Sequence, residues 1–187
     1  MHQQDLIERS RRGDHDAFAQ LVDGAIARLD AAARLILRDH ELARDAVQEA
    51  LIRAWRDLPG LRDLDRFDAW LYRLTVNACL DLVRQRRRRP MEVEMTSIHA
   101  AAMSDVSADL VRRELLDEAL RRLDPAHRAV VALHYLLGMP LRDVAATLGI
   151  PVGTAKSRLH YSLATMRSGV LTDAEPAWAP ITRGQLA

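Results

Sequence analysis

The clearest chemical pattern in the sequence lies near its C-terminal end. A helix there would place six small or hydrogen-bonding residues on one face, at intervals of three and four: Gly153, Lys156, Ser157, His160, Tyr161 and Ala164. Such a face fits the DNA major groove, which is about 12 Å wide, and its side chains can read base edges. Thr154 lies near the positive end of the same helix, which suits a phosphate contact. Arg158 points sideways, toward a phosphate or a brace within the motif.

Two short helices must position this face. The sequence predicts them over 141–148 and 151–166, separated only by Gly149-Ile150. The apolar residues Ala155 and Leu159 of the second helix should pack on Val144 of the first. This arrangement is typical of a helix-turn-helix. A plain helical hairpin on a protein surface has the same pattern, so this segment alone leaves both interpretations open.

Local charge provides a second sign of nucleic-acid binding. The net charge is only +1, from 27 Lys and Arg against 26 Asp and Glu. Nevertheless, residues 84–89 read RQRRRR, residues 90–109 hold four acids and no Lys or Arg, and residues 151–167 are basic again. Two basic segments separated by an acidic one indicate two surfaces that face nucleic acid. Chance clustering of surface charges is the alternative interpretation.

Composition and periodicity favour an all-α fold. Aromatic residues make up 4% of the chain, whereas Ala, Leu and Arg are abundant, and a β-sandwich would need more β-branched and aromatic residues. Helical spacing of apolar residues defines two blocks. We predict two small helical domains over 1–89 and 109–168, joined by a flexible acidic linker over 90–108 and followed by a flexible tail over 169–187. Residues 100–103 of the linker could form a turn of helix.

Local signals place the helix ends. Asp14 should cap the helix that begins after Gly13. Asp39-His40 marks the next break, Pro59-Gly60 ends the following helix, and residues 60–67 form an ordered loop. In the second block Asp124 should cap a helix over 126–137 that ends at Gly138.

Motifs in both blocks resemble bacterial RNA polymerase sigma factors. The first block resembles the sigma-2 domain in its segments 45–49 (DAVQE), 53–56 (RAWR) and 67–73 (FDAWLYR), and at Asn77 and Asp81. The second block resembles the sigma-4 domain in its segments 125–131, 137–138, 144–145, 148–150 and 153–159 (GTAKSRL). Their order and spacing, with a short linker and no other domain, resemble the extracytoplasmic-function (ECF) subgroup of the sigma-70 family.

The resemblance implies a function in transcription initiation. Such a factor binds core RNA polymerase, through the clamp helices and the flap of the large subunits, and directs it to promoter DNA. The residues implied in clamp binding are Asp45, Gln48, Glu49 and Arg53. Without the motif, these residues would be interpreted as a solvated helix face. The resemblance also implies an anti-sigma protein as partner.

Promoter recognition is implied for both blocks. For the −10 element, which must be melted, the implied residues are Arg62, Asp63, Arg66, Phe67, Arg73, Asn77, Arg84, Arg86 and Arg87. The first four would line a pocket for an extruded base, and the last two would hold phosphates. Trp70 is interpreted as a core residue, and Asp81 either contacts DNA or holds Arg73 or Arg84.

The −35 element is assigned to the second block. The implied residues are Thr154, Lys156, Ser157, Arg158, His160 and Tyr161. The family frequently has arginine at the positions of Lys156 and Tyr161, so the preferred −35 sequence stays open. Two rival classes remain beside the sigma factor: a stand-alone helix-turn-helix regulator, which would bind duplex DNA unaided, and a helical scaffold that binds no DNA.

Catalysis, metals and membranes are not indicated. The single cysteine, Cys79, cannot form an internal disulfide, and the seven histidines show no metal-ligand spacing. Cys79 lies on an apolar helix face, as a small core residue does. We therefore expect no enzyme activity, no metal and no cofactor. No run of about 18 apolar residues occurs and the N-terminus is unlike a signal peptide, so we expect a cytoplasmic protein without membrane insertion.

Overall fold

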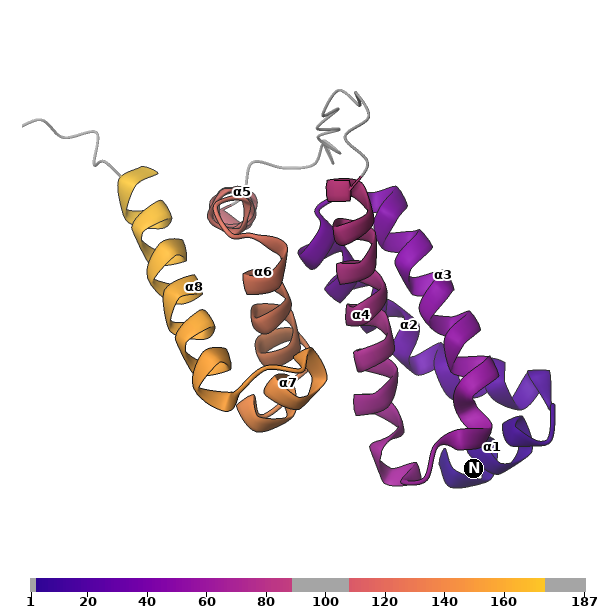
Figure 1. The fold of residues 1–187 in the computed structure, drawn as a ribbon. Coiled ribbons are helices and arrows are strands. Elements are labelled where there is room, and N and C mark those ends of the chain that lie inside the picture. The colour runs from indigo at the N-terminus through magenta and orange to yellow at the C-terminus, as the bar shows by residue number, and fades with distance from the viewer. Residues whose placement is uncertain (1–2, 89–107, 174–187) are drawn as a thin grey trace, which may run out of the picture.

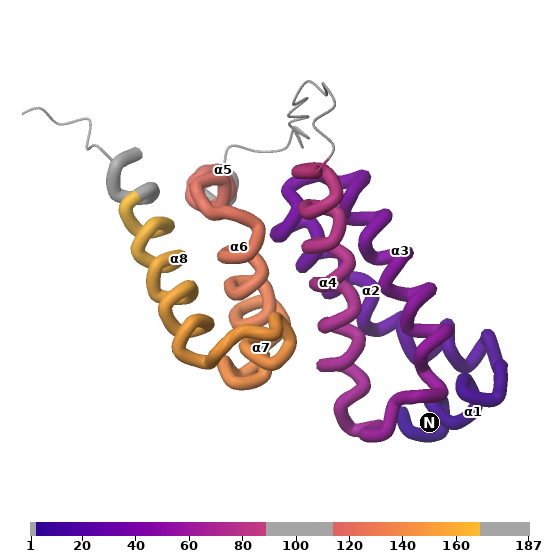
Figure 2. Tube along the Cα trace, viewed as in Figure 1, coloured from indigo at the N-terminus to yellow at the C-terminus, as the bar shows by residue number. Residues whose placement is uncertain are grey.

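The computed structural model describes residues 3–88 and 108–173, with side chains in the second stretch for residues 114–168. All regular structure in these two stretches is helical, which confirms the predicted all-α class. Figure 1 shows two groups of helices side by side, and Figure 2 follows the same path as a tube. None of the described helices combines the length and apolar character that crossing a bilayer requires. Most of the predicted linker, Arg89 and residues 174–187 lie outside the described residues.

The N-terminal domain consists of four helices and two short 3-10 turns. These elements are α1 (Gln3–Arg11), α2 (His15–Leu37), α3 (His40–Asp57), η1 (Leu58–Gly60), η2 (Leu64–Arg66) and α4 (Phe67–Arg88). Asp14 caps α2 by accepting a hydrogen bond from the backbone N–H of Ala17, as predicted. Asp39 caps α3 in the same way through Leu42. The predicted loop over 60–67 therefore contains one of the 3-10 turns.

Small residues let α2 and α3 approach each other closely. Ala32 and Ala33 on α2 and Ala43, Ala46 and Ala50 on α3 are all fully buried. Because an alanine side chain extends only one carbon, helices that meet through alanines pack at short interaxial distances. Larger side chains then fill the space between these helices and their neighbours, and the fully buried ones are Ile7, Leu29, Ile36, Leu58, Phe67, Leu71 and Val76. This core fixes the orientation of α3 and α4.

The C-terminal domain consists of four helices and one π-helical turn. These elements are α5 (Ala108–Arg121), α6 (Pro125–Val131), η3 (Ala132–Leu136), α7 (Leu141–Leu148) and α8 (Val152–Asp173). Asp124 caps α6 by accepting from the N–H of His127, and Pro125 occupies the first turn, as predicted. Helix α8 continues to Asp173, so it includes five residues that the sequence assigned to the tail.

The predicted helix over 126–137 is interrupted by the π-helical turn η3. The N–H of Leu137 donates to the carbonyl of Ala132, five residues earlier, at 3.0 Å. His134 Nδ1 lies 2.8 Å from the carbonyl oxygen of Met139 and ties the end of the turn to the next segment. Gly138, at φ +68°, then reverses the chain. Regular helical spacing of apolar residues did not distinguish this wider turn from an α-helix.

The two domains contact each other directly. Helix α6 and the turn η3 pack on α2, and α6 and α7 pack on α4. Buried apolar residues of both domains form one continuous cluster. In Figure 1, α2 and α4 face the C-terminal domain, whereas α8 lies on its far side. The sequence predicted two domains but not that they would share a packed interface.

Candidate nucleic-acid and polymerase interfaces

Helix α8 separates its faces as the sequence predicted. Ala155 is fully buried and Leu159 is nearly so, and α8 packs through this side on α5, α6 and α7. The residues of the opposite side are exposed: Lys156, Ser157, His160, Tyr161 and Ala164. Thr154 and Arg158 are half-buried at the edge between the two faces. The predicted reading face is therefore open to solvent, and it contains no acidic residue.

A tight turn sets the angle between α7 and α8. Gly149 ends α7 in the left-handed conformation, at φ +63°, which glycine adopts without strain. Its N–H donates to the carbonyl of Ala146, and the N–H of Ile150 donates to that of Ala145. This closed turn is the helix C-cap expected between the two helices of a helix-turn-helix.

Tyr161 is supported by a residue of α6. Its ring lies 4.9 Å from the His127 ring, centroid to centroid, at an angle of 52°. His127 Nδ1 lies 2.8 Å from Asp124 Oδ2, and the same carboxylate accepts the His127 N–H. Tyr161 nevertheless remains 56% exposed. The ring is thus held on one side while its remainder faces solvent. His127 was not identified from the sequence, because it is 34 residues from Tyr161.

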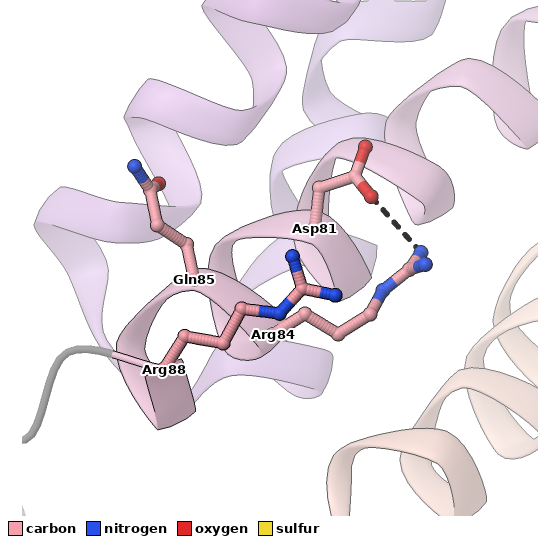
Figure 3. Close-up of a pocket in the computed structure, with 4 residues that line it drawn as sticks. All are labelled: Asp81, Arg84, Gln85 and Arg88. Carbon is pink, nitrogen blue, oxygen red and sulfur yellow. Dashed lines mark ion pairs between the residues drawn. The ribbon is translucent and has the colours of Figure 1, made fainter.

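The C-terminal half of α4 is a basic ridge with one central carboxylate. Asp81 accepts ion pairs from Arg84, at 2.9 Å, and from Arg53 of α3, at 3.3 Å. The sequence left Arg73 and Arg84 open as partners of Asp81. The structure pairs Asp81 with Arg84, and also with Arg53, which was not considered. Asp81 and Arg84 line a depression together with Gln85 and Arg88 (Figure 3). Arg73 is exposed and Asn77 is half-buried on the same helix.

The loop before α4 differs from the predicted pocket at one residue. Arg62, Asp63 and Arg66 are exposed, but Phe67 is fully buried in the core of the N-terminal domain. Phe67 is therefore unavailable to a base in this structure, and its assignment to the pocket was wrong. The apolar side chain begins α4 and packs inward, with its ring 5.9 Å from that of the half-buried Trp70. The interpretation of Trp70 as a core residue is correct in part, because Trp70 packs against the core but is only half-buried.

Helix α1 holds this loop in place. The Arg11 guanidinium donates to the carbonyls of Pro59 and Leu61, at 3.0 and 2.5 Å. Gln3 donates to Asp68 and Gln4 donates to Asp65, at 3.1 and 3.0 Å. Sequence reasoning missed these residues, because their partners lie about 50 to 65 positions away and no local motif connects them.

The outer face of α3 presents the residues assigned to polymerase binding. Asp45, Gln48 and Glu49 are exposed, and Arg53 is half-buried. Arg53 Nε donates to Glu49 at 2.7 Å, and this hydrogen bond is the main cause that raises the pKa of Arg53. Ile52 on the same helix is 55% exposed. The exposure of Ile52 could have been predicted from the sequence, because Ile52 lies outside the stripe formed by Ala46, Ala50 and Ala54.

The arginine run at the end of α4 is exposed as far as the structure describes it. Arg86 and Arg87 both face solvent, and Arg86 forms an ion pair with Asp39 at 3.4 Å. Arg66 forms long ion pairs with Asp63 and, across the domain interface, with Asp143 of α7, both at 3.9 Å. Several of the arginines assigned to −10 DNA are therefore already oriented by carboxylates.

The remaining titratable groups do not form a candidate metal site in the described part of the chain. There, no group of three or more His, Cys, Asp or Glu residues is arranged to hold a metal ion. Cys79 is fully buried, and burial raises the pKa of its thiol to about 12. A thiol that stays protonated is a poor nucleophile. Cys79 is a core residue, as its position on the apolar face predicted.

Comparison with known proteins matches both domains to one family. The model for "Sigma-70 region 2" matches residues 21–89, and the model for "Sigma-70, region 4" matches residues 113–166. The ECF RNA polymerase sigma factor SigW of Bacillus subtilis is 30% identical over 175 aligned positions, and the match covers 86% of this chain and 92% of SigW. The chain belongs to the ECF sigma factors of the sigma-70 family. The ECF RNA polymerase sigma factor SigM of Mycobacterium tuberculosis is 34% identical over 154 residues, 82% of this chain and 77% of SigM.

Solved structures agree with this membership. The sigma factor RpoE of Bartonella quintana, solved in complex with the anti-sigma factor NepR, superposes with a TM-score of 0.68 at 25% identity. The match covers 83% of this chain and 98% of RpoE. CnrH, solved in complex with the cytosolic domain of CnrY, gives a TM-score of 0.65 at 29% identity, over 91% of this chain and 96% of CnrH. As an ECF sigma factor, the chain is a transcription initiation factor that works with core RNA polymerase on promoter DNA.

Proposed function

We propose that three exposed faces divide the work of this sigma factor. The outer face of α3 binds core polymerase, the ridge of α4 with the loop before it binds the −10 element, and the outer face of α8 reads the −35 element. The observation that carries this proposal is α8. Its apolar side is buried, whereas Lys156, Ser157, His160 and Tyr161 on the outward side are exposed, and that side has no acidic residue. Any surface helix buries its apolar side, so the feature that favours DNA is the composition of the exposed side, which combines Lys156 with hydrogen-bonding groups and has no carboxylate.

The −35 assignment follows from the chemistry of the α8 face. Lys156 can approach the guanine acceptors O6 and N7, although as a point charge it lacks the two-pronged geometry of arginine. His160 and Tyr161 offer groups for hydrogen bonds beside it. Ser157 donates its hydroxyl to the Gly153 carbonyl at 3.0 Å, so its oxygen is left to accept. Thr154 stands in the first turn, where backbone N–H groups favour a phosphate.

The −10 assignment uses positive charges that are already oriented. Asp81 holds Arg84 next to the depression on α4, and Arg73 and Asn77 extend the ridge toward the loop. An extruded base loses stacking worth a few kcal/mol, so contacts with the backbone must compensate. Arg62 and Arg66 of the loop are exposed for that purpose. Phe67 has no place in this pocket.

The polymerase assignment depends on the mixed character of the α3 face. Asp45, Gln48 and Glu49 provide polar groups and negative charge, which steer association and fix orientation. The exposed Ile52 on the same helix offers an apolar contact beside them. By analogy with RpoE, which was solved with an anti-sigma factor, we propose that an anti-sigma protein covers part of these surfaces. We also place the protein in the cytoplasm, where polymerase acts, and propose no catalytic activity of its own.

Run-off transcription with purified core polymerase tests this function. The full chain should direct specific initiation from promoters selected out of a library with randomised −35 and −10 segments. Substitution of Lys156 by Ala should alter −35 preference, and substitution of Arg62 by Ala should weaken −10 opening. Tight sequence-specific binding without polymerase, together with no stimulated transcript, would instead support the stand-alone regulator.

A further inference from the structure

Tyr161 is the bulkiest side chain on the outer face of α8, and it is 56% exposed. An exposed tyrosine on a helix ordinarily exchanges between rotamers within picoseconds to nanoseconds. A ring that does so does not present its hydroxyl and its edge to one base in a constant geometry. The contribution of Tyr161 to base reading therefore depends on the groups that restrain its ring.

A ring from α6 restrains Tyr161 on one side. The centroids of the His127 and Tyr161 rings are 4.9 Å apart, and the rings are tilted by 52°, which is a favourable arrangement for an aromatic pair. The side chain of His127 is only 21% exposed, and α6 itself packs on α8. His127 therefore occupies space into which the tyrosine ring could otherwise turn, and fewer rotamers remain for Tyr161.

Asp124 fixes His127 in turn. Asp124 Oδ1 accepts from the backbone N–H of His127 at 3.0 Å, and Oδ2 lies 2.8 Å from Nδ1 of the same residue. Burial opposes ionisation of this carboxyl, but the hydrogen bonds from His127 outweigh it, so the pKa of Asp124 is lowered and the group is a carboxylate at neutral pH. A carboxylate only accepts hydrogen bonds, so Nδ1 carries a proton and donates it. The imidazole is thereby held in one orientation.

The backbone that carries Tyr161 is fixed by packing. Leu159 and Ser162 of α8 are buried, and Ser162 directly follows Tyr161 in the chain. The Ser162 hydroxyl donates to the carbonyl of Arg158 at 2.7 Å, which satisfies this buried group within the helix. Since the Cα atom of Tyr161 has little freedom, the torsion angles of its side chain are the remaining variable. The contact with His127 restricts those angles.

We propose that His127 is a positioning residue for −35 recognition, which together with Asp124 fixes the ring of Tyr161 so that Tyr161 selects a base. This inference rests on the proposed function for the role of α8. A fixed ring can pack on the methyl group of a thymine or hold its hydroxyl against one base edge. Because the ring is ordered before binding, less ordering has to be supplied by the complex. The exposed Lys156 and His160 adjust beside this fixed ring.

Nuclear magnetic resonance of the free full-length protein tests whether His127 fixes the ring. Three-bond couplings of Tyr161 should report one predominant χ1 rotamer in the parent and an average over at least two rotamers in His127→Ala. Asp124→Asn is the matched variant, because asparagine still caps α6 but its amide nitrogen cannot accept from Nδ1. It should give intermediate averaging. Averaged couplings in the parent, or unchanged couplings in His127→Ala, would overturn the proposal.

Promoter selection tests the effect on recognition. Core polymerase with the full chain would select from a library with a randomised −35 segment, and Tyr161→Ala identifies the base positions whose preference depends on this ring. His127→Ala should lower the preference at those same positions about threefold to tenfold and leave the positions that respond to Lys156→Ala unchanged. His127→Phe, which keeps a ring without the Asp124 contact, should restore part of the loss. His40→Ala, which removes an exposed histidine of the other domain, is the control. An equal loss at all positions would show a merely structural role for His127 and overturn the proposal.

A double variant shows whether His127 acts through Tyr161. A residue that only positions another has nothing left to position once its partner is removed. His127→Ala combined with Tyr161→Ala should therefore select the same sequences as Tyr161→Ala alone. A further loss of preference in the double variant would show that His127 contacts DNA itself, and the positioning role would be wrong.

These experiments separate the inference from the proposed function. The couplings of Tyr161 require neither polymerase nor promoter, so they decide by themselves whether His127 fixes the ring. If the parent complex selects no −35 sequence, the proposed function fails, and the recognition role of His127 fails with it even where the ring is fixed. If the parent selects a −35 sequence and Tyr161→Ala changes the preference at no position, the function stands and this inference is wrong.

Discussion

The two domains hold their exposed basic residues in different ways. In the N-terminal domain, Asp81 holds Arg53 and Arg84, and Asp39 holds Arg86. In the C-terminal domain, the side chains of Lys156 and His160 form no hydrogen bond or ion pair with any residue that the structure describes. The support given to the α8 face is instead aromatic, through the contact of His127 with Tyr161.

This difference fits the two targets. A melted strand is flexible, and cations fixed in advance reduce the ordering that binding must supply. Duplex DNA already presents its base edges at fixed positions, so side chains that can adjust are better suited to reading them. Exposure of a basic residue therefore does not by itself define its role, because neighbouring carboxylates decide how freely its side chain can move.

The largest expected effect concerns Phe67, which the sequence assigned to the DNA pocket and the structure places in the core. Phe67→Ala should lower the free energy of unfolding by about 3–5 kcal/mol, because it removes a fully buried ring and leaves a cavity. Urea denaturation followed by circular dichroism measures this change. Arg62→Ala, an exposed change in the same loop, is the control and should stay within about 0.5 kcal/mol. A small effect of Phe67→Ala would return this residue to the DNA-binding surface.

The next effect tests the unpaired charge on α8. Lys156→Ala should weaken discrimination at the −35 element by about 1–3 kcal/mol, because a base contact is lost. Sequencing of promoters selected by the polymerase complex from a randomised −35 library measures it. Arg167→Ala, an exposed cation farther along α8, serves as the control. If both variants select the parent's sequences and only reduce the salt dependence of binding, Lys156 contacts phosphate alone.

A pH effect of about 2 kcal/mol is expected from the N-terminal core. The folded protein keeps the Cys79 thiol protonated to about pH 12, whereas an unperturbed thiol titrates near pH 9.0. The folded-state pKa is the higher one, so the contribution is complete below pH 9 and is lost as the pH rises toward 12. At pH 10.5 the loss should reach about 2 kcal/mol. Denaturation of Cys79→Ala over the same range isolates the thiol, since Tyr72, whose pKa burial also raises, is present in both proteins. Identical slopes would contradict the prediction.

The smallest effect concerns the turn of the helix-turn-helix. Gly149→Ala should destabilise the C-terminal domain by about 1–2 kcal/mol, because a side chain is strained at φ +63°. The added methyl group meets nothing within 4 Å, so the cost is conformational. Gly60→Ala in the N-terminal domain also enters open space, but without a positive φ, and should be nearly neutral. Hydrogen exchange of α7 and α8 compares the two variants, and equal protection would refute the strain.

Local interactions made much of the fold predictable from the sequence. Asp14 and Asp124 bond to groups three residues away, and Gly138 and Gly149 turn the chain at their own positions, so their effects can be read from nearby residues. The two faces of α8 follow from periodicity for the same reason. Phe67 was misassigned because its place in a family motif does not reveal whether its side chain points inward.

The features that sequence reasoning missed depend on residues far apart in the chain. Arg128 reaches Ile36 over 92 positions, and Arg11 reaches Leu61 over 50. No spacing rule connects such pairs, because the partner is a backbone carbonyl that any residue type provides. The π-helical turn η3 was missed for a different reason. One extra residue in a turn hardly alters the apolar pattern of a short helix.

The hold of α1 on the loop before α4 has a practical consequence for work with fragments. The family model for region 2 begins at residue 21, after α1 and Arg11. A fragment trimmed to that boundary would keep α3, α4 and the loop itself, yet the carbonyls of Pro59 and Leu61 would lose their guanidinium donor. Such a fragment would therefore report on an unsupported loop, because trimming at the family boundary removes the side chain that fixes it.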